Sequence, residues 1–202
     1  MRYNPRRTPS PEGSCNTREI DLATAISEIE QARDEAEDGK SPFFIIAGAG
    51  ISAPIIPLAS EIARECKEKA AKYNRTVEPT SKLPLDVYSH WFESAFPHAS
   101  QRQRYFKERI VGKPISHANF RLAHLLSEKR LATLVATPNF DDFLPRALTL
   151  FGIPHIVCDH PNTVERIDPE SAEIQIVHVH GTFWFYDGCN LRGEIEARTK
   201  DS

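Results

Sequence analysis

A glycine-rich turn stands directly after the first strongly apolar run of the chain. The run is 43–47 (FFIIA), and the turn that follows has the pattern G-x-G-x-x-A over 48–53 (GAGISA). Glycines in such a turn let backbone N–H groups approach a pyrophosphate closely. A dinucleotide dehydrogenase would add an acidic residue on a second strand roughly twenty residues on, but the region beyond Pro54 and Pro57 predicts helix and loop. The turn therefore indicates a phosphate site or simply a tight turn, and it argues against hydride transfer.

Polar residues also follow the apolar run 131–136, which predicts a strand. They are Thr137, Asn139, Asp141 and Asp142. One of the two aspartates is expected to cap the helix that begins there. Capping does not account for Thr137 and Asn139, so this strand end is a candidate site.

A pair of histidines ends the last predicted strand, 174–179. His178 and His180 stand two apart, which in an extended chain places them on the same face, and Gly181 allows an immediate turn. Two such histidines could bind a metal ion, but no third ligand is evident, and a structural histidine is a common alternative. We therefore expect no metal site at this strand end.

The elements that must position these residues alternate between strand and helix. Strands are predicted at 43–47, 131–136, 154–158 and 174–179, and helices from Asp21 and at 58–73, 86–96, 101–111, 117–129 and 142–151. Residues 160–173 predict a polar loop, 183–186 at most a short strand, and the last dozen residues carry little pattern.

This order is typical of the α/β class, with a Rossmann-like parallel sheet and helices on both faces. A helical insertion over about 58–115 separates the first two strands. The carboxyl ends of parallel strands meet at one edge of the sheet, so the three polar motifs are expected to converge there.

Composition sets broad limits on function. The 202 residues suit one domain, and the net charge of −3 gives no basic field, so direct binding of nucleic acid is not expected. No apolar run reaches the ~18 residues of a membrane span, and the N-terminus lacks the apolar segment of a secretion signal. We therefore expect no membrane association and a cytoplasmic location.

Residues 1–18 are rich in Pro, Ser and Arg and predict a disordered tail, which leaves 19–202 as the domain. The four cysteines are far apart and form no C-x-x-C pair, which argues against a disulfide framework or a four-ligand zinc site. They are Cys15, Cys66, Cys158 and Cys189.

Taken together, the motifs resemble those of the sirtuin family in the same order. GAGIS at 48–52, TPNFD at 137–141 and HG at 180–181 are similar to the sirtuin sequences GAGIS, T-Q-N-x-D and H-G. The segment that leads into the second motif, 117–123 followed by 131–135, is also similar. The resemblance covers residues 43 to about 186.

Three departures separate the chain from the sirtuin deacylases. Those enzymes follow GAGIS with G-I-P-D-F-R, whereas 55–59 read IIPLA and keep only the Ile-Pro. Pro138 replaces the glutamine of the second motif, and the four-cysteine zinc module cannot form here, so no zinc is expected. In these respects the chain resembles the sirtuin-like NAD hydrolases that serve as effector domains in bacterial anti-phage defence proteins.

The resemblance implies that NAD+ is the substrate and that its nicotinamide–ribose N-glycosidic bond is cleaved to give nicotinamide and ADP-ribose. His180 would be the general base, Asn139 would order water or the ribose, and Asp141 would hold the carboxamide. The remaining implied contacts are a pyrophosphate held by Gly48, Ala49, Gly50, Ile51 and Ser52, and a ribose side lined by Thr137.

Proteins of this kind join the domain to another module and work as oligomers. We therefore expect a further C-terminal domain or a partner defence protein, a sheet completed by further strands, and a homo-oligomer. Cyclisation instead of hydrolysis stays open, as do three other functions: an NAD-dependent protein deacylase, a non-catalytic sensor of NAD or ADP-ribose, and an assembly module. The last would use the aromatic residues of the insertion as its contact face, namely Trp91, Phe92 and Phe96.

Overall fold

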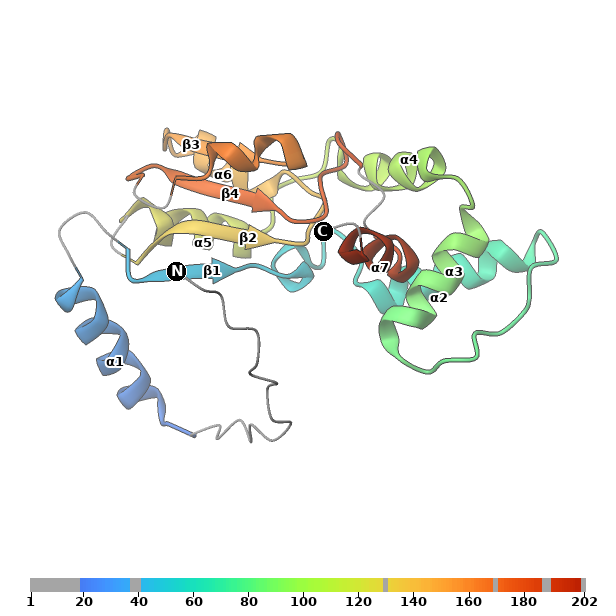
Figure 1. The fold of residues 1–202 in the computed structure, drawn as a ribbon, viewed down its shortest axis with the longest axis horizontal. Helices are drawn as coiled ribbons and strands as arrows, with labels where there is room; N and C mark the ends of the chain where they lie inside the picture. The colour runs from blue at the N-terminus through green and yellow to red at the C-terminus, as the bar shows by residue number, and fades with distance from the viewer. Residues whose placement is uncertain (1–18, 37–40, 129–130, 169–170, 187–189, 201–202) are drawn as a thin grey trace, which may run out of the picture. The chain divides into compact units, whose positions relative to one another are not determined.

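The computed structural model describes residues 19–36, 41–128, 131–168, 171–186 and 190–200 (Figure 1). The tail predicted at 1–18, Cys15 and Cys189 lie outside the described residues. The chain falls into two units, Met1–Glu35 and Ala36–Ser202. In the first unit, α1 (Leu22–Glu35) is the helix predicted from Asp21, and the Asp21 carboxylate caps it by accepting the Thr24 N–H over 2.8 Å.

Within the described residues, four parallel strands form the sheet of the second unit. They are β1 (Phe43–Ile46), β2 (Ala132–Thr137), β3 (His155–Cys158) and β4 (Ile174–His178), in the order β1-β2-β4-β3. Val135 at the centre pairs with Ile45 on one side and Ile176 on the other. The predicted α/β class with a Rossmann-like parallel sheet is confirmed.

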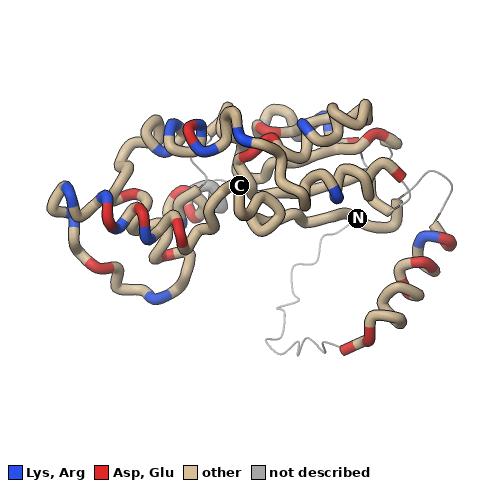
Figure 2. Tube along the Cα trace, turned by 180° about the vertical axis from the view of Figure 1, so that it is seen from behind, with Lys and Arg blue, Asp and Glu red and all other residues tan. Residues whose placement is uncertain are grey.

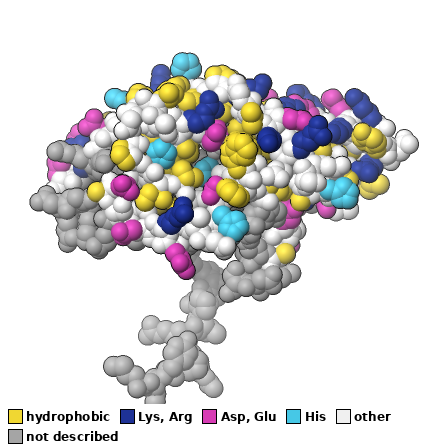
Figure 3. Space-filling model, turned by 90° about the horizontal axis from the view of Figure 1, so that it is seen from above, with side chains coloured by type: hydrophobic (Ala, Val, Ile, Leu, Met, Phe, Trp, Pro, Cys, Tyr) yellow, Lys and Arg dark blue, Asp and Glu magenta, His cyan; other side chains and the backbone are white. Residues whose placement is uncertain are grey.

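Charged residues are confined to the helices and loops around this sheet. None of the four strand sequences contains Lys, Arg, Asp or Glu, as the uncharged strands of Figure 2 show. Figure 3 shows Lys and Arg interspersed with Asp and Glu on the face it presents. Among the described residues, no helix has the length and apolar character needed to cross a membrane.

Two helices pack on the sheet to form one apolar core. They are α5 (His117–Ser127) and α6 (Phe143–Leu150). Core residues with no exposed surface include Leu126, Val135, Leu148 and Ile176. Burying such side chains on the strands and on the facing helix stripes favours the folded state by about 1.5–3 kcal/mol each.

The first strand is less buried than its sequence suggests. A continuous apolar run predicts burial on both faces, but Phe44 and Ile46 are 60% and 72% exposed. That expectation is wrong because α5 and α6 cover one face of β1, the face that carries Ile45 and Ala47, whereas Phe44 and Ile46 point to the other face.

The insertion between β1 and β2 forms most of a second core, to which Phe143, Phe183 and Leu191 also belong. It contains α2 (Ala59–Ala71), α3 (Pro84–Ala95) and α4 (Ala99–Ile110), which Figure 1 shows beyond the carboxyl ends of the strands. Phe92 is fully buried and its ring lies 5.4 Å from that of Tyr88 and 5.3 Å from that of Tyr105. Trp91 and Phe96 are also buried, so these aromatic residues are not a contact face for assembly.

Three regions differ from the sequence prediction. The last dozen residues contain α7 (Arg192–Lys200), and residues 183–186 contribute an isolated bridge between Gly181 and Tyr186 instead of a strand. The loop predicted at 160–173 contains the short 3-10 helix η2 (Pro161–Arg166). The start of α7 depends on tertiary contacts, because Glu194 accepts the Leu191 N–H over 2.9 Å and pairs with Arg102 over 2.6 Å.

Replacing Phe92 with alanine should lower the free energy of unfolding by about 3–5 kcal/mol, because a large cavity would open in the aromatic core. Phe185→Ala is the matched control, since Phe185 is 53% exposed and its loss should change stability by about 0.5 kcal/mol or less. Urea unfolding measures both. Similar losses in the two variants would show that the insertion has no core of this kind.

Candidate active site

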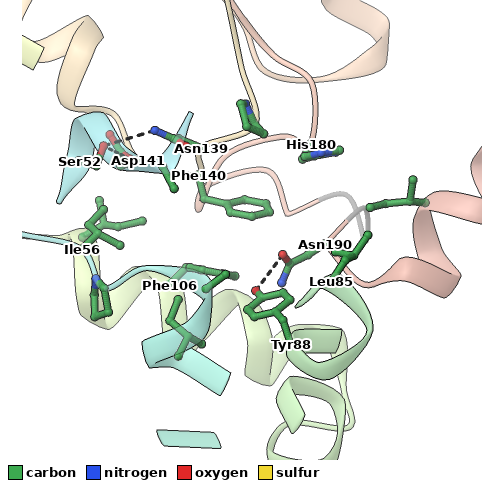
Figure 4. Close-up of a pocket in the computed structure, with 17 residues that line it drawn as sticks. Ser52, Ile56, Leu85, Tyr88, Phe106, Asn139, Phe140, Asp141, His180 and Asn190 are labelled. Atoms are coloured by element: carbon green, nitrogen blue, oxygen red, sulfur yellow. Dashed lines mark hydrogen bonds between the residues drawn. The ribbon is translucent and has the colours of Figure 1, made fainter. Parts of the chain in front are cut away.

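A mostly apolar pocket of about 220 Å³ lies at the carboxyl ends of the strands (Figure 4). The structure brings Asn139, Asp141 and His180 to this pocket from the ends of β2 and β4. The opposite wall comes from the insertion and from the segment that leads into α7. The lining also includes Ala49, Ser52, Ile56, Leu85, Tyr88, Phe106, Ile110, Phe140 and Asn190.

The glycine-rich turn forms the short 3-10 helix η1 (Ala49–Ser52) directly after β1. The Asn139 side-chain amide donates to the Gly48 carbonyl over 3.1 Å, and the Asn119 amide donates to the Ile51 carbonyl over 3.1 Å. A Cβ atom on Gly48 or Gly50 would meet no atom within 4 Å, and neither glycine has a positive φ. The packing of the chain itself therefore does not require glycine at these two positions.

Ser52 connects this turn to the end of the second strand. Its side chain is 2% exposed, and its hydroxyl donates to the Asp141 carboxylate over 2.7 Å. The amides of Asn119 and Asn139 donate to the Ser52 oxygen over 3.3 and 3.4 Å. Because the hydroxyl is committed to these partners, only the backbone of Ser52 remains for the implied pyrophosphate contact.

Asp141 is 5% exposed and serves two structural contacts as well as the pocket. One oxygen accepts from Ser52, and the other accepts the Phe143 N–H over 3.1 Å. Capping of α6 therefore comes from Asp141, while Asp142 at the N-cap position makes no side-chain capping bond. Burial raises the pKa of Asp141 above its ordinary value, and the two hydrogen bonds oppose that rise.

Thr137 does not line this pocket, whereas the resemblance implied that it would line the ribose side. Its hydroxyl donates to the Ala47 carbonyl over 2.7 Å and accepts the Asn139 N–H over 3.1 Å. Thr137 is 5% exposed. It therefore joins the ends of β1 and β2 and holds the backbone of Asn139 in place.

The two histidines lie in different parts of the fold, because the strand ends at His178 and His180 follows in the turn. Strand β4 ends at His178, and the chain then turns at Gly181, whose φ is 78°. His178 is 6% exposed and its Nδ1 lies 2.8 Å from the Asn139 carbonyl, whereas His180 lines the pocket. Burial lowers the pKa of His178, and the Asn139 contact opposes that lowering.

Three polar residues of the site were not identified from the sequence. Asn119 holds the glycine-rich turn to the start of α5. Tyr88 and Asn190 meet in a hydrogen bond across 102 residues of chain. No local sequence pattern could have indicated that pair.

Groups of three or more His, Cys, Asp or Glu side chains suited to a metal ion are not found in the part of the chain that the structure describes. Cys66 and Cys158 are buried free thiols. Burial raises the pKa of Cys66 to about 12, so this thiol is protonated and unreactive near neutral pH.

Compared with models of known protein families and with curated protein sequences, the chain matches none of them.

Replacing His178 with glutamine should flatten the fall in stability between pH 6.5 and 5.5. An imidazole with a lowered pKa binds fewer protons in the folded state than in the unfolded chain, so stability is lost as pH drops below ~6.5, by at most about 1.4 kcal/mol per pH unit. Urea unfolding across this range gives the slopes.

Asp141 is present in both proteins, so the difference between their slopes isolates His178. The control is Ile176→Val on the same strand, which should lower stability at every pH without changing the slope. Parallel slopes for the wild type and His178→Gln would contradict the assignment of a buried, neutral His178.

Proposed function

We propose that the chain hydrolyses NAD+ at the nicotinamide–ribose bond to give nicotinamide and ADP-ribose. The observation that carries this proposal is the convergence of Asn139, Asp141 and His180 on one apolar pocket beside the glycine-rich turn. The order of the motifs, which resembles that of sirtuins, supports the same reaction.

Cleavage of this bond passes through a state with oxocarbenium character at the ribose, and nicotinamide leaves as a neutral molecule. In the proposed mechanism His180 accepts a proton from the attacking water or from a ribose hydroxyl. The amide nitrogen of Asn139 is committed to the Gly48 carbonyl over 3.1 Å, which leaves its side-chain oxygen to orient the water. The apolar wall, which includes Phe106 and Phe140, would exclude other water molecules from the reacting bond.

The glycine-rich turn would hold the pyrophosphate through its backbone N–H groups. The open space at Gly48 and Gly50 supports this role. The protein's own packing would allow a side chain at these two positions, whereas a ligand that approaches the backbone closely would not. The carboxylate of Asp141, which also lines the pocket, would favour the positive charge of the nicotinamide ring.

At the level of the whole protein, we propose an effector that depletes NAD+ in anti-phage defence. This part of the proposal rests on the resemblance alone. It includes a cytoplasmic location, a homo-oligomer and a C-terminal domain or partner defence protein that controls the activity.

Replacing His180 or Asn139 with alanine should each reduce nicotinamide release from NAD+ by roughly 10²–10⁴-fold, the usual effect of losing a proton-transfer or water-orienting group. Release is measured by chromatography with the purified protein. His124→Ala, on the exposed side of α5, is the control and should keep the wild-type rate. Turnover at the wild-type rate in either site variant would rule out its assigned role.

The same assay separates hydrolysis from its rivals. Hydrolysis proceeds without an acetyl-lysine peptide, whereas deacylation requires one. Binding of NAD+ without any product would indicate a sensor, and a cyclic ADP-ribose product would indicate cyclisation.

Replacing Gly50 with alanine should separate the fold from ligand binding. Because a Cβ fits at this position, the free energy of unfolding should stay the same or rise by up to about 1 kcal/mol. Nicotinamide release at low NAD+ concentration should fall roughly tenfold, which corresponds to about 1.4 kcal/mol of lost binding.

The matched control is Gly112→Ala. Gly112 has a φ of 74°, so this variant should lose about 1 kcal/mol of stability while its turnover per folded molecule stays unchanged. Full activity in Gly50→Ala would argue against a pyrophosphate at the turn.

A further inference from the structure

The far wall of the pocket carries a polar pair that the proposed mechanism does not use. The Tyr88 hydroxyl, on α3, donates to the side-chain oxygen of Asn190 over 3.0 Å, and both residues line the pocket. Figure 4 shows the pair across Phe140 from Ser52 and Asp141. The insertion supplies Tyr88 to this wall, and the segment that precedes α7 supplies Asn190.

The side-chain amide nitrogen of Asn190 is one of the buried polar atoms without a hydrogen-bond partner among the described residues. Asn190 is 8% exposed, and among the described residues no acceptor lies in ordinary hydrogen-bond geometry with its side-chain nitrogen, although its interaction with the Tyr186 hydroxyl opposes the rise in the pKa of Tyr186 that burial causes. Leaving a buried N–H group unpaired is unfavourable, so such a group calls for a partner, which can be a water molecule, an ion or a ligand.

Three other side-chain donors of the pocket wall are directed to acceptors within the protein. The Ser52 hydroxyl donates to Asp141, and the Asn139 amide donates to the Gly48 carbonyl. The Tyr88 hydroxyl is committed to Asn190 itself. An ionised Asp141 supplies only acceptors, so it cannot bond the carbonyl oxygen of a ligand.

The walls around Asn190 suit a flat aromatic group. Phe106 and Phe140 stack with their ring centroids 4.5 Å apart and 22° between their planes, and both rings line the pocket together with Leu85. A planar ring can pack on such surfaces while a substituent reaches the amide.

We propose that the Asn190 amide recognises a planar aromatic carboxamide by donating a hydrogen bond to its carbonyl oxygen. Tyr88 is the positioning residue, because its hydroxyl holds the Asn190 oxygen and so turns the nitrogen toward the ligand. This inference rests on the proposed function, in which the carboxamide is the nicotinamide of NAD+.

Binding of three free pyridines to the purified protein, measured by NMR titration, tests the inference without requiring turnover. Nicotinamide carries a carbonyl and an NH2 group, 3-acetylpyridine carries only the carbonyl, and 3-methylpyridine carries neither. Asn190→Asp keeps the acceptor for Tyr88 and removes the donor. It should weaken nicotinamide and 3-acetylpyridine about tenfold, the usual order for one hydrogen bond to a neutral ligand, and leave 3-methylpyridine unchanged.

Tyr88→Phe should weaken the two carbonyl ligands by less than Asn190→Asp does, because the donor remains but is no longer oriented. Tyr105→Phe is its matched control, since Tyr105 belongs to the same aromatic core and donates to Glu65 over 3.3 Å, outside the pocket. All three ligands should bind this control as they bind the wild type. Thermal unfolding checks each fold, and Asn190→Leu replaces Asn190→Asp should the latter be unfolded.

Equal weakening of all three pyridines, or unchanged binding of 3-acetylpyridine, would overturn the assignment of Asn190 as the donor. Failure of the proposed function is a separate outcome. The protein could release no nicotinamide from NAD+ and still bind the pyridines in a way that depends on Asn190. That result would support the carboxamide site and contradict the proposed hydrolase activity.

Discussion

The buried hydrogen bond from Ser52 to Asp141 fixes the turn after β1 to the loop after β2. A carboxylate that is 5% exposed is costly unless donors satisfy it, and Ser52 and the start of α6 supply them. The Ser52 oxygen in turn accepts from Asn119 and Asn139, so η1, α5 and β2 meet at one hydroxyl. The inner wall of the pocket depends on this contact, because moving Ser52 would release the turn and Asp141 together.

Two cores with different tasks surround that contact. The parallel sheet and its helices align the strand ends, which is where polar groups of an α/β protein converge. The aromatic core of the insertion holds Tyr88 and Phe106 against the same edge. The insertion therefore closes the pocket from the side that the sheet cannot reach.

Sequence patterns predicted the elements whose signal is local. Continuous apolar runs gave β2 and β4, and the polar residues at their ends placed Asn139, Asp141 and His180 in one region of the fold. The helix α7 was missed because its start depends on Arg102 and Glu194, which are 92 residues apart. The different environments of His178 and His180 were missed for a related reason, since periodicity alone cannot show where a strand ends.

The interior beside the pocket favours neutral groups. Burial raises the pKa of Asp141 and lowers the pKa of His178, and both shifts oppose charge. Under the proposed function, a cationic nicotinamide ring would enter this environment and favour the ionised form of Asp141, since an opposite charge lowers the pKa of a carboxyl group. Cleavage makes the ring neutral and removes that attraction. The buried carboxylate would therefore bind the cationic substrate more strongly than the neutral product. The burial that makes a charge on Asp141 unfavourable would in this way favour release of nicotinamide from the pocket.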